Sequence, residues 1–349
     1  MLADTLQSLS PTSVHVLADE NTAAHCLPRL RADAPVLANA PVVTIPAGER
    51  HKTIATTEAV WRHLIDARAD RRAVLVNLGG GVVTDLGGYA AACYKRGIRF
   101  VHVPTTLLGM VDAALGGKTG VDFGGVKNSV GAFRMPAYVH TDVAYLRTLP
   151  PRELRSGAAE MYKHALIHDP GHWDELKATT AHWSGAPADD EPDSGLPDLA
   201  GLVARSQRIK LDVVAEDPEE RGLREVLNYG HSVGHAFEAV LLSSTYPALH
   251  GEAIAAGMIC EAYLSQELAG LSVAEVHDIE QTLLAVYGKL RVRANHLASV
   301  LALVANDKKN VGGETRMSLL HRIGEPRLSV RVTDEQVARA VERYVALGG

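Results

Sequence analysis

The sequence predicts a parallel α/β domain followed by an all-α domain. Up to residue 149, short apolar runs alternate with amphipathic stretches, which is typical of a parallel sheet whose strands are joined by helices. The Pro150-Pro151 pair then interrupts the chain, because proline continues neither a helix interior nor a central strand. From Arg152 onward the signals are mostly helical. We therefore assign residues 1–149 and 150–349 to two domains.

Four apolar runs in the first domain are predicted to be buried strands. One helix between them is predicted to begin near Thr53 and to carry Val60, Leu64 and Ile65 on one side. The predicted strands are residues 13–18, 41–45, 73–78 and 100–103, and the predicted helices are residues 54–69, 154–167, 199–215, 225–242, 252–268, 272–287 and 334–346. Residues 184–197, rich in Pro, Gly and Asp, are predicted to form an exposed acidic loop.

The composition is that of an ordinary globular protein with a sizeable core. Of the 349 residues, 46% are hydrophobic and 22% are charged, and the formal net charge is −6. This charge gives no support for nucleic-acid binding, although a local basic pocket for a small phosphorylated or carboxylated molecule fits it. The three cysteines lack metal-ligand spacing, the N-terminus lacks a signal-peptide pattern, and no apolar run reaches the roughly 18 residues needed to span a bilayer. We therefore expect a cytoplasmic protein without membrane or nucleic-acid partners.

One set of residues is typical of a metal-centred active site. His231 and His235 are four residues apart, so on a helix they share a face, and Glu160 and Lys163, three apart, do the same. Two imidazoles and a carboxylate from this set, to which His250 also belongs, can supply three nitrogen or oxygen ligands to a metal and leave one coordination position open, which is typical of catalysis. Because HxxxH lacks the Glu of HExxH and the chain has 16 histidines, a chance pair on an ordinary amphipathic helix is the competing interpretation.

A run of three glycines, residues 79–81, follows the third predicted strand. Glycines let backbone amides approach a pyrophosphate closely, and a following helix adds the positive end of its dipole. The spacing is not GxGxxG, so a plain strand-to-helix turn is the alternative. Asp19 and Asn21 follow the first strand, and Glu49 and Lys52 follow the second, at the strand ends where open α/β sheets bind ligands.

A second glycine-rich region contains Asp112, Lys118, Lys127 and Asn128. Long cationic side chains that emerge from glycine-rich backbone are suited to hold a phosphate or carboxylate, because little bulk blocks the ligand. A solvated loop with ordinary surface charges is the alternative. The run Gly116-Gly117-Lys118-Thr119 is similar to part of the Walker A motif, but the earlier glycine of GxxxxGK[ST] is Asp112 here, so we set an ATPase aside.

Together these stretches resemble 3-dehydroquinate synthase, a family within the sugar phosphate cyclases. The resemblance covers about residues 14–324 and rests on PAGERHK, GGGVVTD, KRGIRF, VPTTLL, VDAALGGKTG, KNSVGAF, RTLPPRE, SGAAEMYKHALI, GLREVLNYGHSVGHAFE, LHGEAIAAGM and NDKK, in this order. It implies an N-terminal Rossmann-like NAD-binding domain, an all-α C-terminal metal-binding domain, an active site in the cleft between them, and a homodimer.

The resemblance also implies roles for individual residues. Glu160, His231 and His250 become the metal ligands, normally for zinc with cobalt as another possibility, while His235 and Glu220 become candidates for proton transfer. The implied substrate-binding residues are Arg96, Asp112, Lys118, Asn128, Lys163, Lys210, Arg224, Asn228 and one lysine of Lys308-Lys309, for which we take Lys309. The implied NAD-contacting residues are Asp19, Asn21, Glu49, Lys52, Gly80, Gly81, Val82, Asp85, Thr105, Thr106, Leu108, Lys127, Thr148 and Glu153.

Two features depart from the family pattern. Many members have a Pro before a Gly-Lys-Asn sequence, whereas Val126 directly precedes Lys127 here, so we expect the loop conformation to differ more than the chemistry. The acidic stretch at residues 188–193 is longer than usual, and we expect it to decorate the surface.

The implied activity is a lyase reaction of the shikimate pathway, which leads to chorismate and the aromatic amino acids. It converts 3-deoxy-D-arabino-heptulosonate 7-phosphate to 3-dehydroquinate and phosphate by oxidation, elimination, reduction and aldol closure, with NAD used catalytically. The nearest alternative is another sugar phosphate cyclase: a 2-epi-5-epi-valiolone, aminodehydroquinate or 2-deoxy-scyllo-inosose synthase. A metal-dependent polyol dehydrogenase is disfavoured because a neutral alcohol would not need the clustered cations. A silent NAD-binding scaffold is the last alternative.

Overall fold

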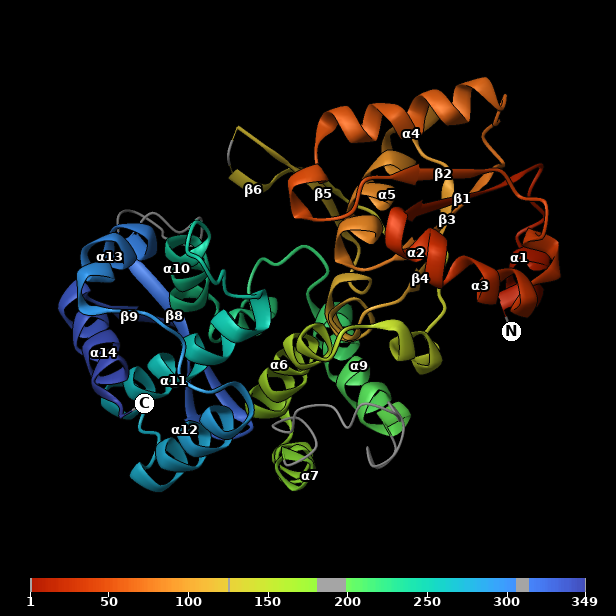
Figure 1. The fold of residues 1–349 in the computed structure, drawn as a ribbon. Helices are drawn as coiled ribbons and strands as arrows, with labels where there is room; N and C mark the ends of the chain where they lie inside the picture. The colour runs from red at the N-terminus through yellow and green to blue at the C-terminus, as the bar shows by residue number, and fades with distance from the viewer. Residues whose placement is uncertain (1, 125, 181–198, 306–313, 349) are drawn as a thin grey trace. The chain divides into compact units, whose positions relative to one another are not determined.

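The computed structural model describes residues 2–124, 126–180, 199–305 and 314–348 (Figure 1). By its internal contacts the chain divides into two compact units, Met1–Pro150 and Pro151–Gly349, called unit 1 and unit 2 below. The predicted acidic loop and the Lys308-Lys309 pair lie outside the described residues.

Unit 1 is built on a five-stranded sheet in which every neighbouring pair of strands is parallel (Figure 1). Its strands, in spatial order, are β2 (Val42–Ile45), β1 (Val14–Asp19), β3 (Val74–Gly79), β4 (Arg99–Pro104) and β7 (Tyr138–Val139). The central strand β3 is buried along its whole length, as expected for a parallel sheet covered on both faces. The parallel sheet is therefore confirmed, and the four predicted strands agree with β1 to β4 to within one residue at each end.

The helices of unit 1 follow local sequence signals. In α4 (Ile54–Asp66) the Thr53 side chain accepts a hydrogen bond from the Thr56 amide, so the predicted start is confirmed. Val60 and Leu64 are buried, but Ile65 is 61% exposed, because it lies about 100° further round the helix than Leu64. The other helices are α1 (Leu2–Ser8), α2 (Glu20–His25), α3 (Leu27–Asp33) and α5 (Gly81–Cys93), with short helical turns at Pro35–Leu37, Glu49–His51, Tyr94–Arg96, Gly109–Ala113 and Val143–Thr148.

An antiparallel hairpin, β5 (Lys118–Phe123) and β6 (Val126–Phe133), forms where the sequence indicated glycine-rich loops. Gly120 and Gly131 face each other across the pair. A Cβ atom on Gly131 would lie 2.1 Å from the Thr119 carbonyl oxygen, so glycine permits the close strand contact. The glycines interrupted the alternation of side chains that identifies a strand, which is why the sequence did not predict this hairpin.

Unit 2 is mainly helical, with α11 (His250–Leu268) buried along most of its length and packed against α6, α10, α12, α14 and β8. The other helices are α6 (Pro151–His168), α7 (Pro170–Ala178), α9 (Leu199–Glu216), α10 (His231–Leu241), α12 (Val273–Tyr287), α13 (Leu297–Ala305) and α14 (Asp334–Ala346), with short helical turns at Leu223–Asn228 and Ala294–His296. The predicted class, a parallel-sheet domain followed by a helical domain, is confirmed.

Two details of the helical prediction are wrong. Residues 225–242 do not form one helix, because the chain turns at Gly230, whose φ of 81° is left-handed, before α10 begins. Unit 2 is also not purely α-helical, because β8 (Thr315–Arg322) and β9 (Glu325–Val332) form an antiparallel hairpin. The turn between them places Gly324 at a φ of 87°, and Met317, Leu319 and Leu320 are buried. Helices α7 and α13 were not predicted either.

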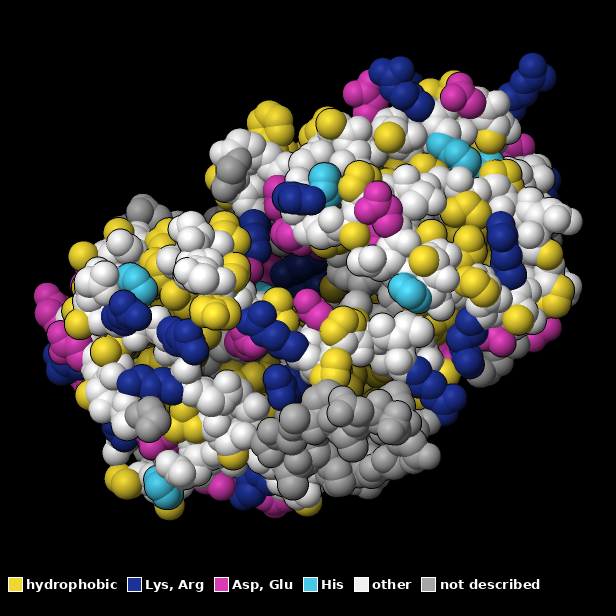
Figure 2. All heavy atoms as spheres, viewed as in Figure 1, with side chains coloured by type: hydrophobic (Ala, Val, Ile, Leu, Met, Phe, Trp, Pro, Cys, Tyr) yellow, Lys and Arg dark blue, Asp and Glu magenta, His cyan; other side chains and the backbone are white. Residues whose placement is uncertain are grey.

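The surface agrees with the modest net charge. On the face shown in Figure 2, Lys and Arg side chains are interspersed with Asp and Glu side chains. None of the helices that the structure describes is both long and apolar enough to cross a membrane. All three cysteines are free.

Candidate active site

Three side chains of unit 2 converge from three helices. Glu160 lies in the middle of α6, whereas His231 and His250 are the first residues of α10 and α11. The Glu160 Oε1 atom lies 3.5 Å from His231 Nε2 and 3.7 Å from His250 Nε2. Glu160 is completely buried, and its Oε1 atom has no hydrogen-bond partner among the described residues. A buried carboxylate oxygen without a donor is costly, so this arrangement favours a cation.

The remaining ring nitrogens show which atoms face that cation. Nδ1 of His231 lies 3.2 Å from the Tyr229 carbonyl oxygen, and Nδ1 of His250 lies 3.1 Å from Glu238 Oε2. Both acceptors favour a proton on Nδ1, so Nε2 is the atom of each ring that faces Glu160 and would bind a metal ion in place of a proton. This is the arrangement in which metal-binding histidines donate their second nitrogen to an oxygen behind them.

The spacing of the three atoms suits a divalent ion. In a tetrahedral zinc site with bonds of about 2.0–2.1 Å, two ligand atoms lie roughly 3.3–3.4 Å apart. The separations of 3.5 and 3.7 Å between Glu160 and the histidines are close to that value. Three such ligands leave a coordination position for water or substrate. The residues that the resemblance assigned to the metal therefore fit the group.

The charges around these ligands also favour a cation. Burial acts to lower the pKa of His250, but the carboxylates of Glu160 and Glu238 outweigh it and raise the pKa to about 9. Burial together with the charge of Lys163 holds the pKa of His231 well below its usual value, so its Nε2 stays unprotonated and can bind a metal. Burial would raise the pKa of Glu160, but the charges of Lys163 and His231 lower it well below the usual range.

His235 lies in the same cluster. The rings of His231 and His235 are 5.1 Å apart between centroids, so the predicted shared helix face is confirmed. Ligand atoms of His231, His235 and His250 all lie within 4.8 Å of one another, which makes a second possible ligand set. Glu160 suits the third position better than His235, because a carboxylate supplies negative charge for a buried divalent ion and His235 is exposed. The proton-transfer role of His235 stays a prediction.

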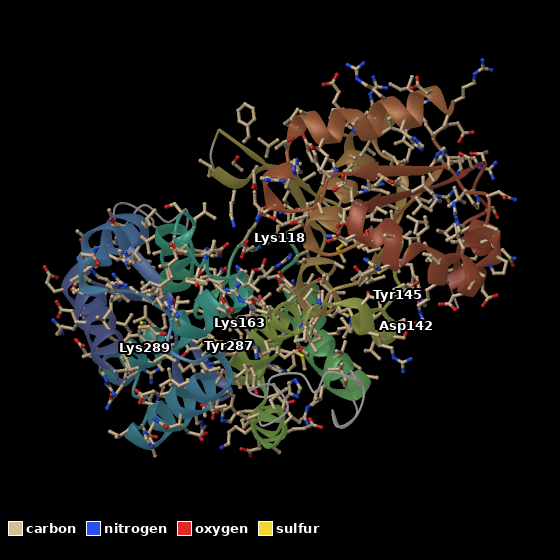
Figure 3. All side chains as sticks on the ribbon, in the orientation of Figure 1. Lys118, Asp142, Tyr145, Lys163, Tyr287 and Lys289 are labelled. Carbon is tan, nitrogen blue, oxygen red and sulfur yellow. The ribbon has the colours of Figure 1, made fainter. Side chains whose placement is uncertain are left out.

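Buried cations lie in the same unit. Lys163 of α6 (Figure 3) is buried. It pairs with Glu160, one turn away on the same helix, and Lys210 of α9 and Arg224 are also buried. A buried cation is kept charged by an anionic partner or ligand, so these side chains are suited to bind anionic substrate groups. Their assignment to substrate is consistent with this burial.

One loop carries three predicted residues at fixed positions. The Asp217 carboxylate accepts hydrogen bonds from the backbone amides of Arg221, Gly222 and Arg224, at 2.8–3.0 Å, and so organises the turn. Within this turn Glu220 adopts a left-handed φ of 57°, and its Oε1 atom accepts a hydrogen bond of 3.2 Å from the side-chain Nδ2 of Asn228. The structure therefore brings together the predicted acid–base candidate and the predicted substrate residues of this segment.

Predicted nucleotide residues gather at the carboxyl edge of the unit 1 sheet. Asp19 ends β1, Gly80 precedes α5 after β3, and Thr105 and Thr106 follow β4, and these three strands are neighbours. Gly80 has no side chain to cap α5, and a Cβ atom there would lie 2.8 Å from Thr106 Cγ2. Bare amides at a helix start beside a threonine are suited to bind phosphate groups.

Lys52 joins two sets of predicted residues. Its ammonium donates to Asp85 Oδ2 at 2.5 Å and to Asn128 Oδ1 at 2.6 Å, so NAD-assigned side chains contact a substrate-assigned one. Asn128 has a left-handed φ of 51°, and its amide donates to Asp122 Oδ1 at 2.8 Å. Burial acts to lower the pKa of Lys52, but Asp85 and Glu49 outweigh it and raise the pKa.

Most of the other predicted residues belong to unit 1, and one of these lies before a strand rather than after it. Lys118 begins β5 (Figure 3), Lys127 is exposed on β6, and Asp112 lies in a π-helical turn, a local form common at functional sites. Asn21 and Val82 lie in the first turns of α2 and α5, and Leu108 lies just before the π-helical turn. Thr148 ends a short helical turn. Glu153 lies in unit 2, in the first turn of α6. Arg96 is that residue, because it precedes β4 and so lies at the amino edge of the sheet.

Sequence reasoning missed Glu238, the carboxylate behind His250. Its signal was its spacing, because Glu238 lies seven residues after His231 and three after His235, which places all three on one helix face. It also missed Asp217, whose carboxylate organises the turn that carries Glu220 and Arg224.

Comparison with known proteins identifies the chain. The N-terminal and C-terminal 3-dehydroquinate synthase families match residues 42–156 and 157–310. The chain is 38% identical over 343 residues to 3-dehydroquinate synthase from Parabacteroides distasonis, covering 98% of this chain and 94% of the relative. It is 44% identical over 286 residues to 3-dehydroquinate synthase from Halorhodospira halophila, covering 81% and 77%.

A solved structure is also similar. It is 2-epi-5-epi-valiolone synthase from Streptomyces hygroscopicus with NAD+ and Zn2+ bound, which is 27% identical with a TM-score of 0.82 and covers 98% of this chain and 92% of that chain. The matches of sequence, of both family halves and of fold agree, and the chain belongs to the 3-dehydroquinate synthase family.

Proposed function

We propose that this protein is a 3-dehydroquinate synthase of the shikimate pathway, acting on 3-deoxy-D-arabino-heptulosonate 7-phosphate with NAD and a divalent metal ion, zinc or cobalt. The observation that carries the proposal is the convergence of Glu160 with the Nε2 atoms of His231 and His250 in a chain of this family. The NAD+ and Zn2+ bound to the similar 2-epi-5-epi-valiolone synthase support the pair of cofactors.

In the proposed reaction, unit 1 would bind NAD and unit 2 would bind the metal ion. When bound, NAD would accept a hydride from a secondary alcohol and return it later, and the metal ion would make that alcohol easier to deprotonate. Unit 1 would hold NAD along the carboxyl edge of its sheet, and Glu160, His231 and His250 of unit 2 would hold the metal.

The remaining residues would manage charge and protons. Lys163, Lys210 and Arg224 would neutralise the phosphate and carboxylate of the substrate, because cations in a dry site stabilise anionic groups strongly. Lys118 and Asn128 would add donors from unit 1. Glu220 and His235 would move protons during elimination and ring closure.

Arg96 would fit this proposal through a second copy of the chain. It lies at the amino edge of the sheet, whereas Asn128 contacts Lys52, which follows β2 at the carboxyl edge. A homodimer in which Arg96 reaches the partner's substrate would explain its assignment. The homodimer and the cytoplasmic location stay predictions.

The decisive experiment supplies the heptulosonate phosphate together with zinc and a catalytic amount of NAD. We expect equal amounts of phosphate and 3-dehydroquinate without net accumulation of NADH, because the hydride is returned in each turnover. Stoichiometric NADH would instead identify a polyol dehydrogenase. A heptulose phosphate without the carboxylate is the matched control, and preference for it would identify another sugar phosphate cyclase.

A further inference from the structure

We propose that Glu261 is a positioning residue for the metal centre, because its buried carboxylate caps the helix that begins with His231. The proposal deepens the proposed function and rests on it, since it concerns how this chain places one metal ligand. Glu261 lies on α11, the helix that begins with the other histidine ligand, His250.

The start of α10 has no local cap. His231 is its first residue, and the preceding residue, Gly230, has no side chain to accept a hydrogen bond from the first amides. The Glu261 carboxylate takes this role from the neighbouring helix. Its Oε2 atom accepts from the Gly230 amide at 2.7 Å, and its Oε1 atom accepts from the Val233 amide at 3.2 Å. A buried backbone amide without a hydrogen-bond acceptor would lower stability, so Glu261 serves as the N-terminal cap of α10.

Close helix packing explains why the cap comes from α11. A Cβ atom on Gly230 would lie 2.4 Å from Met258 Cγ, and one on Gly257 would lie 2.0 Å from the Gly230 carbonyl oxygen. A capping side chain at position 230 therefore has no room. Glu261 reaches both amides from the facing side of α11, where it is completely buried.

The cap acts directly on the placement of His231. His231 lies between the two capped amides, and its Nδ1 lies 3.2 Å from the carbonyl oxygen of Tyr229. The Tyr229 hydroxyl in turn donates to the Met258 carbonyl oxygen at 3.1 Å. Because both anchors and His250 belong to α11, one rigid helix sets the separation of the two imidazole ligands. A metal site requires its ligands to be held within about 0.5 Å, so loss of the cap should weaken metal binding.

The experiment compares Glu261→Gln with Ser265→Ala. The Glu261 carboxylate gives each of the two amides its own acceptor oxygen, whereas Gln has only one acceptor oxygen. Ser265 lies one turn further along α11, where its hydroxyl donates to the Glu261 carbonyl oxygen and accepts from the Leu320 amide. Ser265→Ala thus disturbs the same buried helix without removing the cap. Zinc affinity of the apo-protein and hydrogen exchange of the Gly230 and Val233 amides are measured for both variants and the wild type.

We expect Glu261→Gln to weaken zinc binding by about 10–100-fold, as for other residues that orient metal ligands, and to speed exchange of both amides. Ser265→Ala should lower stability but leave zinc affinity near the wild-type value. Glu261→Asp, which keeps the charge but shortens the side chain, should weaken zinc binding and serves if Glu261→Gln does not fold. Wild-type zinc affinity in the folded Glu261 variants, or equal losses in Ser265→Ala, would overturn the proposal. A wild-type protein that binds no zinc would overturn the proposed function itself.

Discussion

Two histidines, His102 of unit 1 and His250 of unit 2, have opposite basicity. His102, on β4 of unit 1, is 3% exposed beside the Asn77 amide, and burial lowers its pKa from 6.5 to about 3. His250 in unit 2 lies beside Glu160 and Glu238, and these carboxylates raise its pKa to about 9 although burial acts in the opposite direction. Burial alone excludes charge from a histidine, and carboxylates reverse that effect. His102 therefore serves as a neutral group in the core of unit 1, whereas the carboxylates around His250 form a site that favours positive charge.

Removing the Glu160 carboxylate from the site around His250 should have the largest effect on metal content and activity. Glu160→Gln takes away the anionic ligand, so we expect loss of bound metal and a fall in activity on the order of a thousandfold. It also removes the carboxylate charge that pairs with the buried Lys163, and breaking such a pair should cost about 3–5 kcal/mol of stability. Metal content and unfolding are measured on the same preparation.

The matched control breaks a buried lysine–carboxylate pair in unit 1. Asp85→Asn removes the partner that Lys52 contacts at 2.5 Å. It should lower stability but leave the metal content unchanged. Full metal content in Glu160→Gln would contradict the ligand assignment.

Removing the second carboxylate beside His250, that of Glu238, should have a smaller effect on the metal site. Glu238→Gln keeps the shape of the side chain but replaces the negative charge behind His250, so we expect metal affinity to fall by about 10–100-fold. Isothermal titration of the apo-protein with zinc measures the change. Glu267→Gln, at the exposed end of α11, is the control and should have no effect. Equal affinities in the two variants would show that Glu238 does not act on the ligand.

The smallest expected effect concerns His102 and pH. The unfolded chain takes up a proton near pH 6.5, but folded His102 stays neutral down to about pH 3. The unfolded state therefore binds more protons in this window, so the stability contributed by neutral His102 is present above pH 6.5 and is lost as the pH falls. We expect a loss of about 2 kcal/mol between pH 7 and pH 5.

His102→Gln tests this expectation, because glutamine does not titrate and can still accept from Asn77. Urea unfolding at several pH values should give a shallower loss of stability on acidification in the variant than in the wild type. Parallel pH dependences for the two proteins would contradict the assignment of a neutral buried His102.

Local signals predicted much of the fold. The capping side chain of Thr53 and the strict periodicity of α14, which begins at Asp334 as expected, depend on neighbours in sequence alone. The β5–β6 hairpin escaped prediction because its glycines hide the alternating pattern, and the break at Gly230 escaped because the packing of Met258 and Gly257 decides it. Residues far apart along the chain supply those contacts.

The sequence by itself determined the two architectural classes, the shared face of His231 and His235, and the resemblance that pointed to Glu160 and His250. Helical and strand periodicities are local, so they can be read without knowing what packs against them. Only the tertiary structure decided that Glu160 meets both imidazoles within 4 Å, that Glu238 and Glu261 support them, and that Arg96 lies at the other edge of its sheet. The reason is that these relations depend on how separate helices and strands pack, and packing is set by contacts between residues distant in sequence.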